Sequence, residues 1–217
     1  MKVLIFGASG SAGSSVLSVS LVAADVHEVR AVTRRPLDIR HPKLTQVRHD
    51  DYQDYAAVEG VFAGVDACLY CLGKSARQVA GEPEYRRITY DFAMAAARTL
   101  RACSPAAAFH YVSGAGAGLD SRFMWARLKA EAERDLMAQF DAVCWRPASI
   151  DGVPSASEPR AYKLFRPMPR LLFKPFRSLY VTGDDIGRAM LVATRERLRH
   201  RIVPNAEIRE MAARAQR

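Results

Sequence analysis

The chain has 217 residues, of which 49% are hydrophobic, and its formal net charge is +9. This length fits one full α/β domain, and no apolar run reaches the ~20 residues that a membrane-spanning helix requires. The positive charge is compatible with nucleic acid as a partner, but no recognition motif accompanies it, so we do not expect nucleic-acid binding.

The chain opens with the order strand, glycine turn and helix. An apolar run at residues 3–6 leads into Gly7, Gly10 and Gly13, and a helical pattern of apolar residues follows. Glycines let the backbone approach a pyrophosphate closely, and the N–H groups at the start of a helix attract the anion. The pattern therefore predicts a dinucleotide-binding loop, and the alternative is a plain glycine turn in another α/β protein. The residues expected to contact the cofactor in this loop are Gly7, Ser9, Gly10, Ser11, Ala12 and Gly13.

Strands and helices alternate along the rest of the chain. Apolar runs predict further strands at residues 28–35, 44–51, 65–73, 107–114 and 141–147. Helical patterns occur at residues 54–62, 84–102, 122–140 and 184–196, the last with Thr182 or Asp184 as its N-cap. Residues 201–216 predict a short strand and a terminal helix. This alternation predicts an α/β fold with a doubly wound parallel sheet, the Rossmann fold, with right-handed crossovers.

The start of the chain and its four cysteines predict a cytoplasmic protein. The first apolar run is too short for a secretory signal and enters the glycine turn directly. Cys68 and Cys71 form a C-x-x-C, but they lie in a predicted strand, where a spacing of three points side chains to opposite faces. We therefore expect reduced core thiols and no metal site.

The composition changes at Asp151, and residues 151–177 are rich in proline, arginine and phenylalanine. We interpret residues 151–180 as a lid on the substrate side of a single NAD(P)-binding domain that spans residues 1–217, because ligands bind at the carboxyl ends of the strands in such sheets. The alternative is a membrane-surface segment, since basic residues alternate with Phe and Leu. Pro167, Pro169 and Pro175 would break an amphipathic helix, which favours the lid.

The residues after the second strand indicate which dinucleotide is bound. An NAD site usually has an acidic residue there, which bonds the ribose 2′-hydroxyl. This chain has Thr33, Arg34 and Arg35 instead, and a guanidinium binds a 2′-phosphate with charge-assisted hydrogen bonds. NADP(H) is therefore favoured over NAD(H), with Arg34 as the main ligand; the alternative is that both arginines are solvated. Asp51, after the third strand, is expected to bind the adenine amino group, or it caps the next helix.

Motifs along most of the chain resemble those of the atypical short-chain dehydrogenase/reductases. They are GASGSAG at the N-terminus, TRR, DYQD, CLG, YVSG and WRP after successive strands, and TGDDIGRAM before the last long helix. The resemblance extends from Met1 to about Ile208 and is greatest to Tat-interacting oxidoreductase-like proteins. It implies a Rossmann fold with bound NADP(H), and further cofactor contacts at Cys71, Leu72 and Gly73.

The resemblance also implies a catalytic set of Ser, Tyr and Lys, with Tyr and Lys four residues apart on one helix face. Here the stretch reads WARLK, so Lys129 is present but Trp125 replaces the tyrosine, and Ser113 stands near the serine position. An indole N–H is not a titratable acid, so the usual proton transfer cannot run through residue 125. Trp125 is then expected to line the substrate pocket with Lys74 and Arg146, although core packing and a structural salt bridge are the alternatives for Trp125 and Arg146.

Two functions therefore stay open. The first is an NADP-dependent oxidoreductase that acts on a small carbonyl or alcohol, and the second is a non-catalytic NADP(H)-binding regulator or interaction protein. Tyr85, Tyr90 and Tyr111 are other tyrosines that we consider as proton donors. The expected partner is a small-molecule substrate or ligand, and a homodimer is an arrangement that the sequence leaves open.

Overall fold

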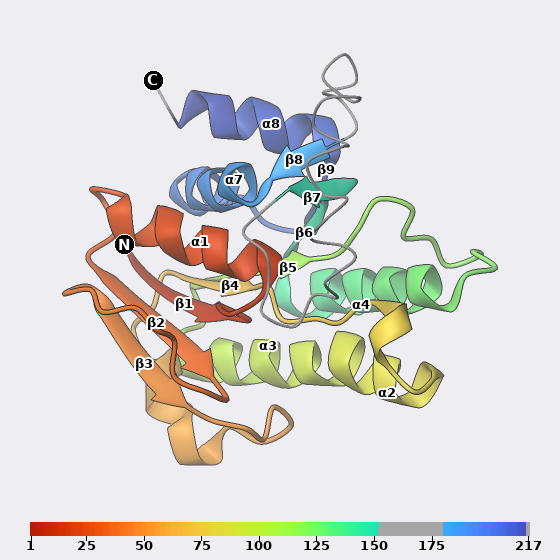
Figure 1. The fold of residues 1–217 in the computed structure, drawn as a ribbon, viewed down its shortest axis with the longest axis horizontal. Coiled ribbons are helices and arrows are strands. Elements are labelled where there is room, and N and C mark those ends of the chain that lie inside the picture. Colours follow the sequence, from red (N-terminus) through yellow and green to blue (C-terminus); the bar gives the residue numbers. More distant parts are fainter. Residues whose placement is uncertain (152–179, 216–217) are drawn as a thin grey trace.

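The computed structural model describes residues 1–151 and 180–215. Within them, seven parallel strands form one sheet in the order β3-β2-β1-β4-β5-β6-β9 (Figure 1). The strands are β1 (Lys2–Phe6), β2 (Glu28–Thr33), β3 (Leu44–Arg48), β4 (Ala67–Tyr70), β5 (Ala108–Val112), β6 (Val143–Arg146) and β9 (Arg201–Pro204). The doubly wound parallel sheet predicted from the sequence is therefore confirmed.

Helices cover both faces of this sheet (Figure 1). The α-helices are α1 (Ser11–Val22), α2 (Glu82–Arg86), α3 (Phe92–Cys103), α4 (Met124–Phe140), α7 (Gly183–Arg195) and α8 (Asn205–Arg214). One buried cluster joins the strands to α1, α7 and α8, and a second joins them to α3 and α4. Every residue of β4 is buried, which explains its continuous apolar sequence.

Some predicted boundaries and one predicted helix were wrong in detail. Residues 54–62 form a 3₁₀ helix, η1 (Ala56–Phe62), which kinks at Val58. The predicted helix over 84–102 is divided into α2, a π-helical turn η3 (Arg87–Asp91) and α3. A second sheet pairs β7 (Ser149–Asp151) with β8 (Tyr180–Thr182) in parallel, and these three-residue strands are too short to give a periodic signal. A short 3₁₀ helix, η2 (Ala76–Gln78), is also present.

The structure confirms that Cys68 and Cys71 point to opposite faces of their strand, and it selects Thr182 from the two predicted N-caps. Cys68 belongs to the buried cluster under α3, whereas Cys71 packs against the cluster under α1, so the two thiols lie on opposite faces and are free. Thr182 is the N-cap of α7, because its hydroxyl accepts a hydrogen bond from the Asp185 N–H at 3.0 Å. The described residues contain no cluster of metal-ligating side chains, and none of their helices is long and apolar enough to cross a membrane.

The predicted lid, residues 151–180, falls almost entirely outside the described residues. Of its residues, the structure describes only Asp151 in β7 and Tyr180 in β8. The predicted organisation of residues 1–217 as a single domain with a lid is therefore not tested. The lid therefore stays a prediction.

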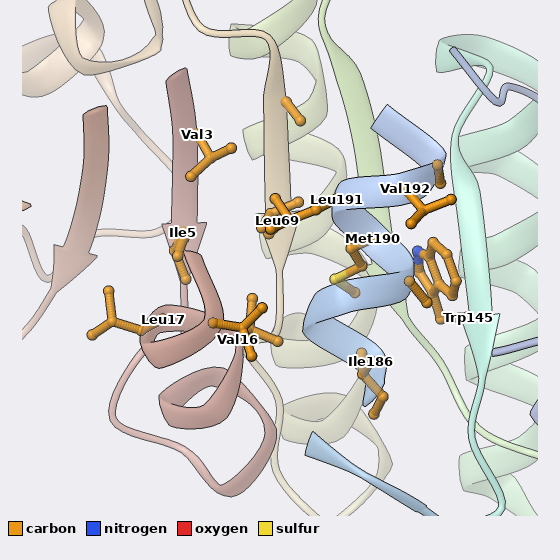
Figure 2. Packing of buried hydrophobic residues seen from close by; sticks show 14 of the residues in the cluster. Val3, Ile5, Val16, Leu17, Leu69, Trp145, Ile186, Met190, Leu191 and Val192 are labelled. Atoms are coloured by element: carbon orange, nitrogen blue, oxygen red, sulfur yellow. The ribbon is translucent and has the colours of Figure 1, made fainter. Parts of the chain in front are cut away.

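A buried polar chain connects strand β5 to β6 and α7. Trp145 Nε1 donates to His110 Nδ1 at 3.2 Å, and His110 Nε2 lies 3.0 Å from the hydroxyl of Thr194, which itself donates to the Met190 carbonyl. Burial lowers the pKa of His110 to about 3, so its ring is neutral and carries its proton on Nε2. Figure 2 shows Trp145 in the same apolar cluster as α7. These hydrogen bonds help to fix strand β5, and Ser113 follows directly after its end.

Helices α1 and α7 pack closely because α7 has glycines at their contact. A Cβ on Gly183 would lie 2.6 Å from the Cβ of Ser15, and one on Gly187 would lie 3.1 Å from the Cα of Val16. Val16 and Leu17 of α1 share the buried cluster with Ile186 of α7 (Figure 2). This contact sets the position of α1, whose first turn carries the end of the glycine loop.

We expect Gly183→Ala to lower the free energy of unfolding by about 1–3 kcal/mol, because the added methyl group would overpack the contact with Ser15. Urea denaturation would measure it. Gly60→Ala is the matched control, since nothing lies within 4 Å of a Cβ there. Adding Ser15→Gly to the Gly183→Ala variant should restore stability. A double variant with the same free energy of unfolding as Gly183→Ala alone would contradict this account.

Candidate functional site

The glycine loop between β1 and α1 is packed backbone against backbone. Gly7 has a φ of +76°, and a Cβ there would lie 2.7 Å from the backbone of Cys71 and Leu72. A Cβ on Gly13 would collide with the carbonyl oxygen of Gly7. The loop therefore requires glycine at both positions, and it lies directly beside the end of β4, where the sequence places further cofactor contacts.

The start of α1 is open to an anion. Gly10 is the N-cap and contributes no side-chain hydrogen bond, and no acidic residue occupies the first turn. The first N–H groups of a helix lack partners within the helix and carry its positive dipole end. The residues of this loop therefore fit the pyrophosphate of a dinucleotide, as the sequence predicts.

A cleft of about 460 Å³ opens at the carboxyl ends of β2, β3 and β4. Of the residues singled out from the sequence, it brings together Arg34, Asp51, Leu72, Gly73 and Lys74. The other residues that line it are Asp50, Tyr52, Gln53, Glu84, Arg87, Ile88 and Phe92. The predicted contacts Thr33 and Arg35 flank Arg34 outside this lining, Thr33 buried and Arg35 exposed.

The charged side chains of the cleft differ in how they are paired. Lys74 Nζ lies 3.2 Å from Glu84 Oε1. The Ala80 N–H and the Lys74 ammonium hold the pKa of Glu84 below its usual value. Asp51 accepts a hydrogen bond from the Gln53 N–H at 3.0 Å. By contrast, no carboxylate in the described part of the chain forms an ion pair with Arg34.

One wall of the cleft is aromatic. The rings of Tyr52 and Phe92 lie 5.7 Å apart, and Tyr52 also packs edge-on to Phe6 at 6.2 Å. Burial raises the pKa of Tyr52, which keeps its hydroxyl neutral. Flat apolar rings beside a guanidinium and carboxylates form a surface on which a heterocyclic base can stack while its polar edge is bonded.

A second group of side chains gathers beyond the end of β5. Lys129 Nζ donates to the Ser113 carbonyl oxygen at 2.7 Å. A Cβ on Gly114 would lie 3.9 Å from Lys129 Nζ and 4.0 Å from the Trp125 ring. The structure therefore brings Ser113, Trp125 and Lys129 to one place, as the sequence predicts, and Trp125 is only half-buried there.

Two features of this group are costly for the fold alone. The Ser113 hydroxyl is buried and has no hydrogen-bond partner among the described residues. Burial lowers the pKa of Lys129 to about 8, although the Glu133 carboxylate opposes that shift. Both groups therefore lower the stability of the folded chain.

Arg146 is occupied by an ion pair. Its Nη2 and Nε lie 2.5 Å and 2.9 Å from the two carboxylate oxygens of Glu133, which is 1% exposed. This bonding raises the pKa of Arg146 and neutralises a buried charge. The geometry favours the structural interpretation of Arg146, and its part in a substrate pocket with Lys74 and Trp125 stays a prediction.

The three alternative tyrosines already have internal partners. The Tyr111 hydroxyl donates to the Thr89 carbonyl at 3.1 Å, and that of Tyr90 donates to Asp135 at 2.7 Å. Tyr85 is buried, which raises its pKa, and its hydroxyl bonds Thr89. None of these three hydroxyls is placed with Ser113 and Lys129.

Sequence reasoning missed most of the cleft wall. Asp50 and Tyr52 stand beside Asp51 after the third strand, so the rule that ligands gather at carboxyl ends could have included them. Arg87, Ile88 and Phe92 carried no usable signal, because their direction depends on the π-helical turn.

Comparisons with known proteins identify the family of this chain. Residues 7–144 match the model of a family described as NAD(P)H-binding. The mitochondrial protein FMP52 of Eremothecium gossypii is 26% identical over 219 residues, which cover 96% of each chain. Protein HTATIP2 of Rattus norvegicus is 28% identical over 136 residues, which cover 61% of this chain and 54% of that protein.

A solved structure shares the fold. It is an oxidoreductase of the short chain dehydrogenase/reductase family from Burkholderia thailandensis. Its TM-score is 0.71 at 17% identity, with 95% of this chain and 92% of that chain covered. The resemblance to short-chain dehydrogenase/reductases is therefore confirmed at the level of the fold.

The half-buried Lys129 yields a prediction about stability. Desolvation lowers its pKa from 10.5 to about 8, a cost on the order of 2–3 kcal/mol because the group is partly solvated, and removing it forfeits one hydrogen bond of about 1 kcal/mol. We therefore expect Lys129→Met to raise the free energy of unfolding by about 1–2 kcal/mol at pH 7, measured by urea denaturation.

The pH dependence of that gain identifies its cause. Between pH 8 and pH 10.5 the unfolded chain binds more protons at Lys129 than the folded chain does, so the wild type becomes more stable as the pH rises. The advantage of the variant should shrink across this window. An advantage that is constant from pH 7 to pH 10.5 would show that the charge is not responsible.

Proposed function

Because the chain belongs to the NAD(P)H-binding family and has the fold of short-chain dehydrogenase/reductases, we propose that it binds NADP(H) and transfers a hydride to or from a small carbonyl or alcohol. The observation that carries this proposal is the Ser113 hydroxyl beside Lys129, which has no hydrogen-bond partner among the described residues. A carbonyl oxygen of a substrate would accept the hydrogen bond that the Ser113 hydroxyl lacks.

Different residues bind different parts of the cofactor. The glycine loop holds the pyrophosphate, and Cys71, Leu72 and Gly73 bind alongside it. Arg34, flanked by Thr33 and Arg35, holds the 2′-phosphate, while Asp51 accepts from the adenine amino group. When bound, NADP(H) supplies or accepts the hydride at its nicotinamide ring.

At the reacting end, the protein's part is orientation. Lys129 holds the nicotinamide ribose, for which its ammonium is already directed toward the end of β5 by its bond to the Ser113 carbonyl. Ser113 orients the substrate oxygen. Trp125 provides an apolar wall, because its ring edge lies 3.5 Å from the position of a Cβ on Gly116. A flat wall at this place excludes water from the reacting atoms.

The second candidate is a non-catalytic NADP(H)-binding protein, and Trp125 favours it. The indole cannot donate a proton in the way that the tyrosine of the family does. None of Tyr85, Tyr90 and Tyr111 lies with Ser113 to replace it. In this case Ser113 and Lys129 would only bind the ligand.

The expected cytoplasmic location and the homodimer stay predictions. The relative FMP52 of Eremothecium gossypii is a mitochondrial protein, and its location is not carried over to this chain.

Cofactor choice is tested by titrating the protein with NADPH and NADH by fluorescence. We expect tighter binding of NADPH, and we expect Arg34→Gln to weaken NADPH by about tenfold or more while NADH changes little, because a hydrogen bond to a charged group is lost. Arg40→Gln is the control, since Arg40 is also exposed but does not line the cleft. A preference for NADH would refute the assignment of Arg34.

Catalysis is tested with a turnover screen of aldehydes, ketones and quinones. If the native protein is an oxidoreductase, NADPH oxidation should depend on one of these substrates and fall at least about 100-fold in Ser113→Ala, since the hydroxyl that orients the substrate is lost. Activity that is absent in the native protein and created by Trp125→Tyr would instead identify a binding protein that lacks the acid. Unchanged binding of NADPH in both variants is the control for folding.

A further inference from the structure

Two neighbouring arginines on one helical segment have different environments. Arg86 ends α2 and forms two hydrogen bonds of 2.7 Å with the carboxylate of Glu131 on α4. It also stacks over the ring of Tyr90 at 4.6 Å. Arg87 begins η3, is exposed and lines the cleft. Within the described residues it forms no ion pair and no side-chain hydrogen bond.

The π-helical turn explains why Arg87 lies on the cleft side. In η3 the Phe92 N–H donates to the Arg87 carbonyl, five residues earlier, instead of four. The wider turn brings residues i and i+5 to the same side of the segment, whereas an α-helix aligns residues i and i+4. Arg87 and Phe92 therefore face one cleft, and Ile88 between them is buried.

The far side of the cleft carries the matching charge. Arg34 follows β2 and lines the same cleft as Arg87, together with the aromatic side chains Tyr52 and Phe92. The third cation of the lining, Lys74, is already paired with Glu84 at 3.2 Å. Arg34 and Arg87, the two guanidiniums of this lining, form no ion pair in the described part of the chain, and they border one cavity with an aromatic wall.

We propose that Arg87 is a second ligand of the adenosine 2′-phosphate, which it clamps together with Arg34. The inference rests on the proposed binding of NADP(H) and adds a residue from a different element to it. A phosphate dianion has enough acceptor oxygens for two guanidinium forks, and each fork adds charge-assisted hydrogen bonds. The acidic side chains Asp50 and Asp51 on the same lining repel an anion, so a phosphate bound here needs more than one cation to offset them.

The test compares NADP⁺ with NAD⁺, which differ only in the 2′-phosphate. Dissociation constants are measured by calorimetry on the full chain. We expect Arg87→Gln to weaken NADP⁺ by about tenfold or more and NAD⁺ by less than about twofold, because a hydrogen bond to a charged group is worth that much. Arg87→Lys, which keeps the charge but loses the fork, should be intermediate.

Arg98→Gln is the matched control, because Arg98 is exposed on the adjoining helix α3 and does not line the cleft. Competition by 2′-AMP and 5′-AMP separates the phosphate positions, and only the affinity of 2′-AMP should fall in Arg87→Gln. Circular dichroism should show the same helix content in all variants, so that a loss of binding is not a loss of fold.

Three results would overturn the inference, and they are distinguishable. Equal losses for NADP⁺ and NAD⁺ would place Arg87 at the pyrophosphate or on the adenine. An unchanged preference for NADP⁺ in Arg87→Gln, together with a lost preference in Arg34→Gln, would leave the proposed function intact and remove Arg87 from it. A wild type that binds neither nucleotide would refute both the proposed function and the clamp.

Discussion

The fold and the candidate site both depend on glycines that let two segments of the chain pack against each other without an intervening side chain. At the β1–α1 turn, Gly7 touches the end of β4 and Gly13 touches Gly7, so no room is left for a Cβ at either place. The same condition returns where Gly183 of α7 meets Ser15 of α1. Helix α1 is therefore held at its start by its own loop and along its length by α7. An anion-binding helix end needs such support, because its N–H groups must stay directed at the ligand without the ligand's help.

The positive charges of this chain, whose net charge is +9, fall into paired and unpaired groups. Several arginines are fixed by a carboxylate, among them Arg146 by the buried Glu133 and Arg86 by Glu131. These guanidiniums hold elements together and are not available for a ligand. Lys129 differs, because burial costs the fold free energy that its bond to the Ser113 carbonyl only partly offsets. Perturbed pKa values of this kind are common in binding sites.

The sequence is sufficient to predict those parts of the fold that depend on local pattern. Glycine spacing predicted the loop, continuous apolar runs predicted the buried strands, and Thr182 was one of two residues predicted as the cap of α7. It was not sufficient where hydrogen-bond register decides the outcome. Apolar periodicity over residues 84–102 is compatible with one helix, and the π turn that divides it leaves no mark in residue type. The partner of Arg146 was equally hidden, since Glu133 is brought to it from another element. That Thr33, Arg35 and the residues of the glycine loop contact a cofactor stays a prediction, because only a complex with the cofactor would test these contacts.

The π turn between α2 and α3 has a consequence for how such a site can change. An α-helical segment reads its sequence in steps of about 100° per residue. A π turn contains one residue more than an α-helical turn. The side chains before it are therefore rotated about the helix axis relative to the side chains after it. The orientation of the cleft-lining side chains Arg87 and Phe92 therefore depends partly on the length of the backbone. Removing a single residue from Arg87–Asp91 would redirect the preceding side chains while every remaining side chain stayed chemically the same. Insertions and deletions in this helix therefore change the lining of the cleft in a way that substitution alone does not.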